Sequence, residues 1–489
     1  MRSNIGSVSK QFTAFAISLL AERGKLSLDD PVRKHIPELP AFDNTVTLRH
    51  LLTHTSGYRD FYSILSMAGR SVMKGDYIGH EELIEVIQRQ PKLQNEPGAE
   101  FSYNNTGYGL LATVVERVAD QPFRSWMKQN VFEPLGMSHT VVRANPFQIV
   151  TNSAQGYAPA EDGGYRNAPD LSAAMGAGAI YTTVRDLAEW IENLETAELG
   201  GKDVIRQMTT PYVLASGDTT NVGFGVVLDE HRGLQRIAHS GGDIAHRARL
   251  MYYPEIDAGI VTMSNNRTFA PAKISAKIAE AFLHENMKVE KTSAEIEKGD
   301  EPDPEHYNTE AFDALTGRYE FGKSLGNAVL TITRKNQSFF AQMTGQPKLK
   351  ITPASDSTFK LHSVPGSITF HGNKTGTADS LTLHQSGTYL AHRLEEAAWE
   401  PSEEDLATYT GRYFSKELQT YYTLTAKGGQ LLVQHRRLGK INLKPTQNDT
   451  FSGEFPVSEV TFTRNEEGTI TGFAVANGRA QGVRFKKQR

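Results

Sequence analysis

The second half of the chain repeats itself with a period of about 90 residues, and this repeat constrains the fold more than any other feature of the sequence. The copies share a Gly-Arg-Tyr tripeptide, a proline and two phenylalanines: Gly317-Arg318-Tyr319 recurs as Gly411-Arg412-Tyr413, Pro353 as Pro445, Phe359 as Phe451, and Phe370 as Phe462. Strand-like segments between Gly, Asn and Asp turns run from Val329 to Thr333, Ser367 to Phe370 and Ser380 to His384. The period is too long for a solenoid unit, so we expect two small closed antiparallel β-barrels, because closure protects sheet edges.

The composition changes at Lys288 to Tyr307, where Glu, Lys, Asp and Pro replace apolar residues, as is typical of a solvated linker. Before this segment helical and extended patterns alternate, which predicts a mixed α/β domain. We therefore expect this domain at residues 1–287, a linker at 288–307, and the barrels at 308–395 and 396–489. Within the first domain the patterns predict helices at Phe12 to Leu20, Tyr108 to Ala119 and Ile274 to Phe282, and a hairpin at Arg247 to Ser264. Beyond the linker we expect only one short acidic helix, near residues 395 to 407.

Charge and cysteine content exclude several classes of function. The 52 Lys and Arg residues nearly balance the 56 Asp and Glu residues, so no overall field attracts nucleic acid or an anionic membrane. With no cysteine, the chain has no disulfide, thiolate zinc site, iron-sulfur cluster or cysteine nucleophile. The apolar run from Phe12 to Leu20 is about half as long as a membrane span requires. We expect a small-molecule or peptide substrate, no metal and no cofactor, and leave a homo-oligomer open.

Two familiar motifs in the first repeat are better explained as strands and turns. Gly317 to Ser324 matches the phosphate-binding pattern G-x-x-x-x-G-K-[ST], but Ala328 to Thr333 reads as a strand where that motif needs a helix. The second repeat also loses the match. Gly322 to Gly326 spells G-x-S-x-G, which requires a strand-to-helix turn. We therefore expect a hairpin loop here.

A Ser-x-x-Lys tetrad, Ser7-Val8-Ser9-Lys10, stands at the start of the first amphipathic helix. Positions three apart share a helix face, so the Lys10 amine can reach the Ser7 hydroxyl, while the helix N-terminus stabilises a developing oxyanion. Such a tetrad also occurs by chance, with a solvated serine and lysine, so it needs support from elsewhere in the chain.

Two downstream motifs supply this support. Tyr103-Asn104-Asn105 lies on a turn before the helix that we expect to open at Thr106, and can present a phenol and an amide to one cleft. His239-Ser240-Gly241-Gly242 lies just before the hairpin, where an edge strand can supply an amide N–H to an oxyanion hole. Three motifs in this order are much more specific than any one alone.

With these motifs the sequence resembles the serine β-lactamase and penicillin-binding protein superfamily, in its class C, esterase and D-aminopeptidase branch. Three further segments support the resemblance: Leu51 to Gly57, Gly176 to Trp190, and Gly223 to Gly225. The two β modules make the chain similar to the three-domain D-aminopeptidases. The resemblance implies a penicillin-recognising domain, with an antiparallel sheet flanked by helices, followed by two barrels.

The resemblance also implies roles for particular residues. Ser7 would be the nucleophile, Lys10 its base and Tyr103 a partner in proton transfer, with Lys10 and Tyr103 acting as a coupled pair. Asn105 would bind the substrate amide, and the backbone N–H groups of Ser7 and Gly242 would form the oxyanion hole. His239, Ser240 and Gly241 would complete the substrate-binding wall.

Three other residues are interpreted as structural. His54 has no second histidine or carboxylate at metal-ligand spacing, so we interpret it as a turn residue. Asp186 and Trp190, four residues apart, are interpreted as a helix cap and a core residue.

The sequence departs from the family pattern at His239, where penicillin-recognising members usually carry lysine. A histidine is mostly neutral at pH 7, so the fixed cation for a substrate carboxylate is weakened, although Arg247 or Arg249 can replace it. We therefore expect a serine hydrolase that forms an acyl-enzyme on small amides or esters, resembling a D-aminopeptidase or an esterase. A β-lactamase or D-Ala-D-Ala carboxypeptidase is an alternative, and a non-catalytic binding protein with this fold is another.

A second departure lies before Ser7, where the family places a strand pair and a helix that six residues cannot form. We therefore expect a natural product longer by roughly 30 to 70 residues, and expect the 489-residue chain to be unstable or inactive. Any export signal would lie in that segment, so the compartment, periplasmic or cytoplasmic, stays open.

Overall fold

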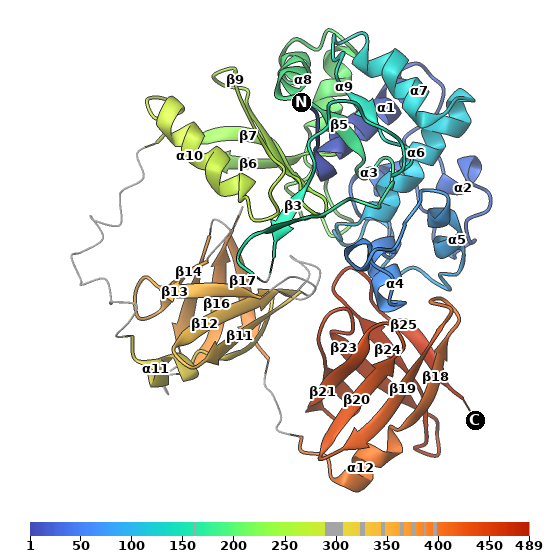
Figure 1. Ribbon diagram of the computed structural model, residues 1–489, viewed down its shortest axis with the longest axis vertical. Coiled ribbons are helices and arrows are strands. Elements are labelled where there is room, and N and C mark those ends of the chain that lie inside the picture. Colours follow the sequence, from blue (N-terminus) through green and yellow to red (C-terminus); the bar gives the residue numbers. More distant parts are fainter. Residues whose placement is uncertain are drawn as a thin grey trace.

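The computed structural model describes residues 1–160, 162–288, 307–322, 328–343, 348–361, 366–372, 377–385, 388–394 and 399–488. Most of the expected linker at 288–307 and of the expected loop at Gly322 to Gly326 lies outside these residues. The described chain forms an α/β domain followed by two closed antiparallel barrels, which confirms the expected fold class (Figure 1).

The first domain contains two sheets that share no strand, and a short pair of strands. The three-stranded sheet has the order β1-β5-β2, the four-stranded antiparallel sheet has the order β6-β7-β8-β9, and β3 pairs with β4. The strands are β1 Ser3–Asn4, β2 Val141–Val142, β3 Tyr157–Pro159, β4 Tyr165–Asn167, β5 Ile180–Thr182, β6 Val227–His231, β7 Leu234–Gly242, β8 Arg247–Tyr253 and β9 Ala258–Ser264. The expected hairpin is therefore confirmed as β8 and β9.

Helices surround these sheets, and the three helices that periodicity predicted are among them. The helices are η1 Gly6–Val8, α1 Ser9–Glu22, α2 Val32–His35, α3 Leu48–Leu52, α4 Phe61–Met67, η2 Val72–Lys74, α5 Glu82–Gln88, α6 Asn105–Ala119, α7 Phe123–Met127, η3 Lys128–Phe132, α8 Val184–Thr196, α9 Gly201–Met208 and α10 Pro271–Leu283. α1, α6 and α10 match the predicted helices. α6 opens at Asn105, one residue before the expected Thr106.

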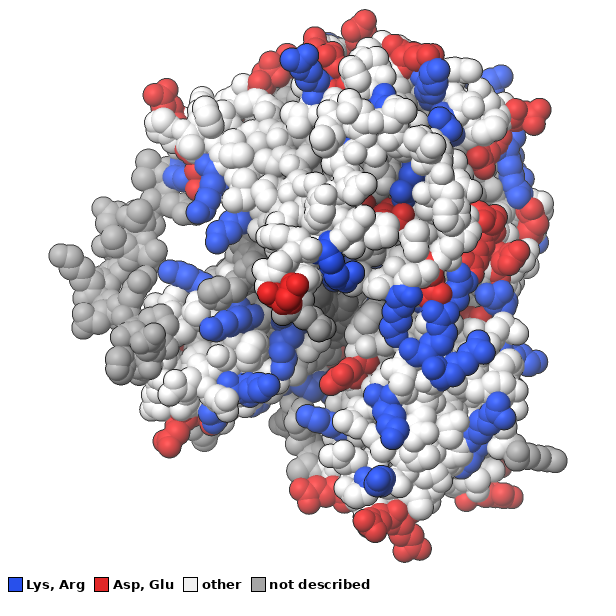
Figure 2. All heavy atoms as spheres, viewed as in Figure 1, with Lys and Arg blue, Asp and Glu red and all other residues white. Residues whose placement is uncertain are grey.

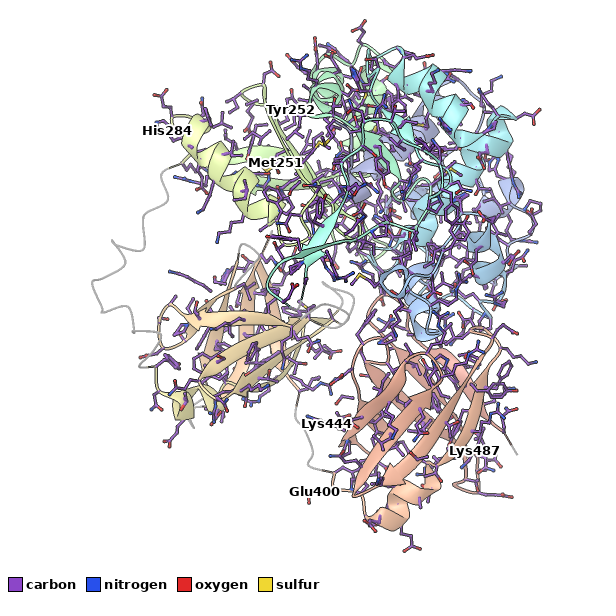
Figure 3. The ribbon with its side chains drawn as sticks, viewed as in Figure 1. Met251, Tyr252, His284, Glu400, Lys444 and Lys487 are labelled. Atoms are coloured by element: carbon purple, nitrogen blue, oxygen red, sulfur yellow. The ribbon has the colours of Figure 1, made fainter. Side chains whose placement is uncertain are left out.

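The four-stranded sheet is covered on both faces. Neighbouring residues of β8 point to opposite sides: Tyr252 joins the main core, whereas Met251 joins a smaller core with Ala279 of α10 (Figure 3). On β9, Gly259 lies against Ile191 of α8, and the Thr262 hydroxyl bonds to Ser275 of α10. This two-sided packing fixes the strand that carries the third motif.

α1, the helix that contains Lys10 of the tetrad, is buried over most of its length. Every residue of α1 from Ser9 to Leu20 is buried. The rings of Phe12 and Phe15 lie 4.8 and 5.1 Å from that of Trp190, whose indole N–H donates to Gln11. Trp190 is therefore a core residue, as expected, and it fixes α1 from the side opposite to the tetrad.

The two barrels have the same topology, strand for strand. The first contains β10 Gly317–Glu320, β11 Val329–Lys335, β12 Ser338–Met343, β13 Leu349–Pro353, β14 Thr358–Leu361, β15 Ser367–Gly372, β16 Ala378–His384 and β17 Thr388–Arg393. The second contains β18 Gly411–Ser415, β19 Thr420–Lys427, β20 Gln430–His435, β21 Gly439–Gln447, β22 Thr450–Ser452, β23 Glu459–Arg464, β24 Ile470–Ala476 and β25 Val483–Lys487. The repeated residues are structurally equivalent, because Pro353 pairs with Phe359 as Pro445 pairs with Phe451.

Each barrel begins with a short helix, and one of these was not predicted. α12, Glu403–Thr408, is the expected acidic helix, but α11, Thr309–Asp313, contradicts the expectation of a single helix beyond the linker. α11 is five residues long, too short to show a helical period. It forms because the Asn308 side chain caps its first N–H groups and because Phe312 packs on Phe339 inside the barrel.

Candidate active site

The Ser-x-x-Lys tetrad spans a short 3₁₀ turn and the start of α1. Ser7 lies in η1, and Lys10 is in the first turn of α1, fully buried. The Lys10 Nζ atom lies 3.1 Å from Ser7 Oγ, 2.9 Å from Asn105 Oδ1 and 2.9 Å from the carbonyl oxygen of Ala177. The amine thus contacts the hydroxyl that sequence spacing predicted.

The surroundings of Lys10 favour its neutral form. Burial lowers the pKa of Lys10 below its ordinary value, and this effect outweighs the raising effects of Tyr103 and Asp60. The positive charge of Arg479 lowers it further. An amine that gives up its proton more easily is better able to accept one from a neighbouring hydroxyl.

Tyr103 and Asn105 lie on either side of the residue that caps α6. Asn104 is the N-cap, and its side chain accepts a bond from the N–H of Gly107. The ring of Tyr103 lies 4.9 Å from Lys10 Nζ, and Asn105 accepts from the same Nζ atom. One N–H of the Asn105 amide also donates to Asp60 Oδ2 at 2.9 Å, so both ends of this amide already have partners in the protein.

Asp60, which the sequence analysis did not single out, holds this group together. It is the N-cap of α4, where its Oδ1 atom accepts from the N–H of Ser63. Its Oδ2 atom accepts from both the backbone and the side chain of Asn105. An aspartate before a helix is common, so no sequence signal distinguishes this one.

His54 occupies the turn after α3, as expected, and it also contacts Tyr103. It is buried, with a left-handed backbone at φ 58°. Its carbonyl oxygen accepts from the N–H of Ser102 and its Nδ1 atom from the N–H of Asn104, so it fixes the backbone on both sides of Tyr103. The two rings lie 4.4 Å apart. Burial, with Lys10 nearby, keeps the pKa of His54 well below its ordinary value, so the imidazole is neutral.

The third motif lies at the end of β7. β6 pairs with β7 only as far as Ala238, so the next four residues have one free edge, and η1 lies along it. His239 Nδ1 donates to the carbonyl oxygen of Ser240 at 2.6 Å, and burial lowers the pKa of His239 to about 3. The imidazole is therefore neutral, as expected. Across the strand pair, Arg249 donates to Ser240 Oγ at 2.6 Å.

Glycines allow the first and third motifs to touch. A Cβ atom on Gly6 would lie 2.2 Å from the backbone nitrogen of Gly242, and one on Gly241 would lie 1.8 Å from the carbonyl oxygen of Ile5. Gly6 also has a left-handed backbone, with φ of 50°. Only glycine permits this approach, which brings the backbone next to Ser7 against Gly242.

A cleft of about 1400 Å³ opens above Ser7 and is lined by all three motifs. Three of its five carboxylates form ion pairs: Asp170 with Arg143, Asp229 with Arg236 and Asp243 with His246. The other two, Asp60 and Asp218, accept hydrogen bonds from neutral groups. Its three remaining cations are Arg247, Arg249 and Arg479, and among the described residues none of them lies within 4.0 Å of a carboxylate oxygen. Among the described residues, three positive and two negative charges therefore line the cleft without an ion-pair partner.

Arg479, which sequence reasoning missed, enters the cleft from the second barrel. It lies in the loop between β24 and β25, and its guanidinium carbon is 5.1 Å from the centre of the Tyr103 ring. Tyr389 of the first barrel also lines the cleft. A second hollow of about 2220 Å³ separates the two barrels and shares Tyr103 and Arg479 with the cleft. Figure 2 shows a hollow between the two barrels, and Figure 3 places Lys444 of β21 on the side of the second barrel that faces the first.

Asp186 has a structural role at the start of α8. It lies in the first turn of α8, where its carboxylate accepts from the hydroxyls of Thr140 and Thr183 and its own N–H donates to Thr183, the N-cap.

In the described part of the chain, no cluster of three or more histidines and carboxylates could hold a metal. Within the same residues, no helix has the length and apolar character needed to cross a bilayer.

Comparison with known proteins supplies the family. The Beta-lactamase family profile matches residues 1–284. A penicillin-binding protein of Bacillus subtilis is 26% identical over 405 residues, covering 78% of this chain and 85% of that protein. The D-aminopeptidase of Gluconobacter oxydans is 24% identical over 277 residues, or 57% of this chain, so the match spans about half (51%) of that enzyme.

Solved structures show the same fold. A penicillin-binding protein from Bacillus halodurans is 30% identical, with a TM-score of 0.50, over 58% of this chain and 85% of that one. The octameric penicillin-binding protein homologue from Pyrococcus abyssi is 23% identical, with a TM-score of 0.55, and covers 80% of this chain and 88% of that one. At that identity the likeness concerns the fold alone.

Proposed function

The chain belongs to the β-lactamase family, and on this premise we propose that it is a serine hydrolase that forms an acyl-enzyme through Ser7 on small amides or esters. The observation that carries the proposal is the buried Lys10 amine 3.1 Å from Ser7 Oγ, with a lowered pKa. A nucleophile and its base at hydrogen-bond distance are what covalent catalysis requires.

The geometry supports the following sequence of steps. Neutral Lys10 accepts the Ser7 proton as Oγ attacks the substrate carbonyl carbon, and the backbone N–H groups of Ser7 and Gly242 stabilise the oxyanion. Lys10 and Tyr103, a coupled pair, return the proton to the leaving amine or alcohol, which breaks the scissile bond. Water then attacks the acyl-enzyme and releases the acid and free Ser7.

D-Amino-acid amides and peptides, or simple esters, are the leading substrates. The neutral His239 in the third motif supports this choice, because a lysine there would favour a substrate carboxylate. The similarity to a D-aminopeptidase and the two appended barrels also support it. Asn105, Ser240 and Gly241 are proposed to contact the substrate.

A second candidate is hydrolysis of carboxylate-bearing substrates, as in a β-lactamase or a D-Ala-D-Ala carboxypeptidase. The observation that favours it is the Arg249 guanidinium, which faces the cleft beside Ser240, with its buried Nε atom lacking a hydrogen-bond partner. Arg249 thus supplies, beside Ser240, the positive charge that the neutral His239 does not provide. A non-catalytic binding protein would have no physical need for the Ser7 and Lys10 pair.

Labelling with a fluorophosphonate tests the nucleophile. We expect one label on Ser7 and none in the Ser7→Ala variant. A panel of p-nitrophenyl esters, D- and L-amino-acid anilides and a chromogenic cephalosporin then separates the candidates. An Arg249→Gln variant should lose activity on the cephalosporin and keep it on neutral esters if the second candidate is correct. A folded, unlabelled protein that hydrolyses none of these would contradict the proposal.

Substitution of Lys10 tests its role as base. Lys10→Met preserves most of the buried volume but accepts no proton, so the acylation rate should fall on the order of a hundredfold or more, the usual scale for a positioned base. Stopped-flow labelling measures this rate, and thermal unfolding controls for the fold. Near-normal acylation in a folded Lys10→Met protein would remove Lys10 from the mechanism.

A further inference from the structure

We propose that Arg479 makes the second barrel part of the active site, as a positioning residue that acts on Lys10 and Tyr103 from outside the catalytic domain. The proposal rests on the proposed function, because Lys10 matters only if Ser7 reacts. Two independent contacts carry it, one through the backbone of Arg479 and one through its guanidinium.

The backbone contact begins a chain of hydrogen bonds that ends at the nucleophile. The N–H of Asp60 donates to the carbonyl oxygen of Arg479 at 3.1 Å. Asp60 Oδ2 accepts from Asn105 Nδ2 at 2.9 Å, Asn105 Oδ1 accepts from Lys10 Nζ at 2.9 Å, and Lys10 Nζ lies 3.1 Å from Ser7 Oγ. The loop of the second barrel is thus four hydrogen bonds from the reactive oxygen.

The loop that carries Arg479 is held firmly at both ends. Arg59, which is 1% exposed, donates to the carbonyl oxygen of Gln481 at 2.7 Å and to Glu417 of the same barrel at 3.2 Å. On the other side of Arg479, the Asn477 amide donates to the carbonyl oxygen of Ser63 in α4 at 3.4 Å. These buried bonds hold the position of Arg479 against the catalytic domain.

The guanidinium acts through its charge. The Arg479 guanidinium and the Lys10 amine both lie near the ring of Tyr103, at 5.1 and 4.9 Å from its centre. Burial is the main reason why the pKa of Lys10 is lowered, and the positive charge of Arg479 adds to it, against the raising effects of Tyr103 and Asp60. Because no described carboxylate pairs with Arg479, a neighbour does not cancel this charge. It also favours any negative charge that develops on the phenol.

The test compares Arg479→Gln with Arg479→Lys, which keeps the charge. Arg412 supplies a matched control, because its guanidinium lies 3.9 Å from the ring centre of Tyr421 on the same barrel, but outside the cleft. Each variant is assayed for the pH dependence of Ser7 labelling. The Nζ titration of Lys10 is followed in parallel by ¹⁵N NMR on lysine-labelled protein, with the signal assigned from Lys10→Met.

Removing a cation stabilises the protonated amine, so Lys10 should lose its proton at higher pH in Arg479→Gln. We expect both the NMR titration and the acid limb of the labelling profile to move up by about half a pH unit to one unit. Labelling at pH 7 should fall about three- to tenfold and recover at alkaline pH. Arg479→Lys should restore the wild-type profile, and Arg412→Gln should match it.

An unmoved Lys10 titration in Arg479→Gln would overturn the proposal, as would a loss of labelling that is equal at every pH and is not restored by lysine. The NMR readout needs no activity. If wild-type Ser7 takes no label while Arg479→Gln still shifts the titration, the proposed function fails and the effect of Arg479 on Lys10 stands.

Discussion

The first barrel closes around Phe359 and the second around Phe451, and much of their internal construction is shared. In each, the tyrosine of the repeated tripeptide donates to a carbonyl oxygen four residues earlier at 2.8 Å, Tyr319 to Leu315 and Tyr413 to Tyr409. The difference lies in their attachment. The core of the second barrel is continuous with that of the first domain, whereas the core of the first barrel is separate.

One buried residue of the second barrel illustrates this difference. The strand partner of Tyr413 is Tyr422, whose hydroxyl donates to the carbonyl oxygen of Met67 in the first domain at 2.6 Å. The equivalent partner of Tyr319 is Leu330, which has no hydroxyl to donate. At this position the second barrel therefore has a hydrogen bond to the first domain that its equivalent residue in the first barrel cannot make.

The largest difference between the barrels should appear when the equivalent core phenylalanines are truncated. Phe359→Ala and Phe451→Ala each create a cavity in a fully buried site and should cost about 3 to 5 kcal/mol. All three tryptophans lie outside the first barrel, two in the first domain and Trp399 against Phe451. Thermal unfolding followed by tryptophan fluorescence should therefore shift strongly in Phe451→Ala and little in Phe359→Ala. Equal shifts would mean that the first barrel unfolds together with the rest.

Breaking the buried ion pair should have the next largest effect. Glu417→Ala leaves Arg59 buried without its carboxylate and should cost about 3 kcal/mol, the lower end of the range because Glu417 Oε2 is itself unsatisfied. The matched control is Asp313→Ala, which removes the exposed pair with Arg334 in the first barrel and should destabilise the protein much less, because water screens exposed ion pairs. Urea unfolding measures both. Similar losses of unfolding free energy in the two variants would show that the buried ion pair does not hold the second barrel against the first domain.

The smallest effect should come from removing the internal tyrosine hydrogen bond that both barrels share. Tyr319→Phe and Tyr413→Phe delete the same internal bond, so each should destabilise its own barrel by about 1 kcal/mol. Amide hydrogen exchange measured on peptides from each barrel resolves the two effects. A difference well above 1 kcal/mol would show that docking also strengthens the interior of the second barrel.

Local patterns explain what could be predicted from the sequence. The barrels follow from alternation and turns, and α1, α6 and α10 follow from helical periodicity, because each signal lies within a short window. The three motifs do lie together, although the chemical roles of Ser7, Lys10 and Tyr103 stay predictions. Asp60 and Arg479 could not be found in this way. The first is an ordinary helix cap, and the second reaches the site only through the docking of a barrel more than 400 residues along the chain from Ser7.

The contact between the first and third motifs also has a genetic consequence. Every single-nucleotide change in a glycine codon that alters the residue introduces a Cβ atom. At Gly6 and Gly241 that atom would meet backbone, the nitrogen of Gly242 and the carbonyl of Ile5, so no second substitution of a side chain could make room for it. Saturation mutagenesis should find that neither position tolerates any other residue, including alanine. Two residues with no side chain at all are thus among the positions of this protein least free to change over generations.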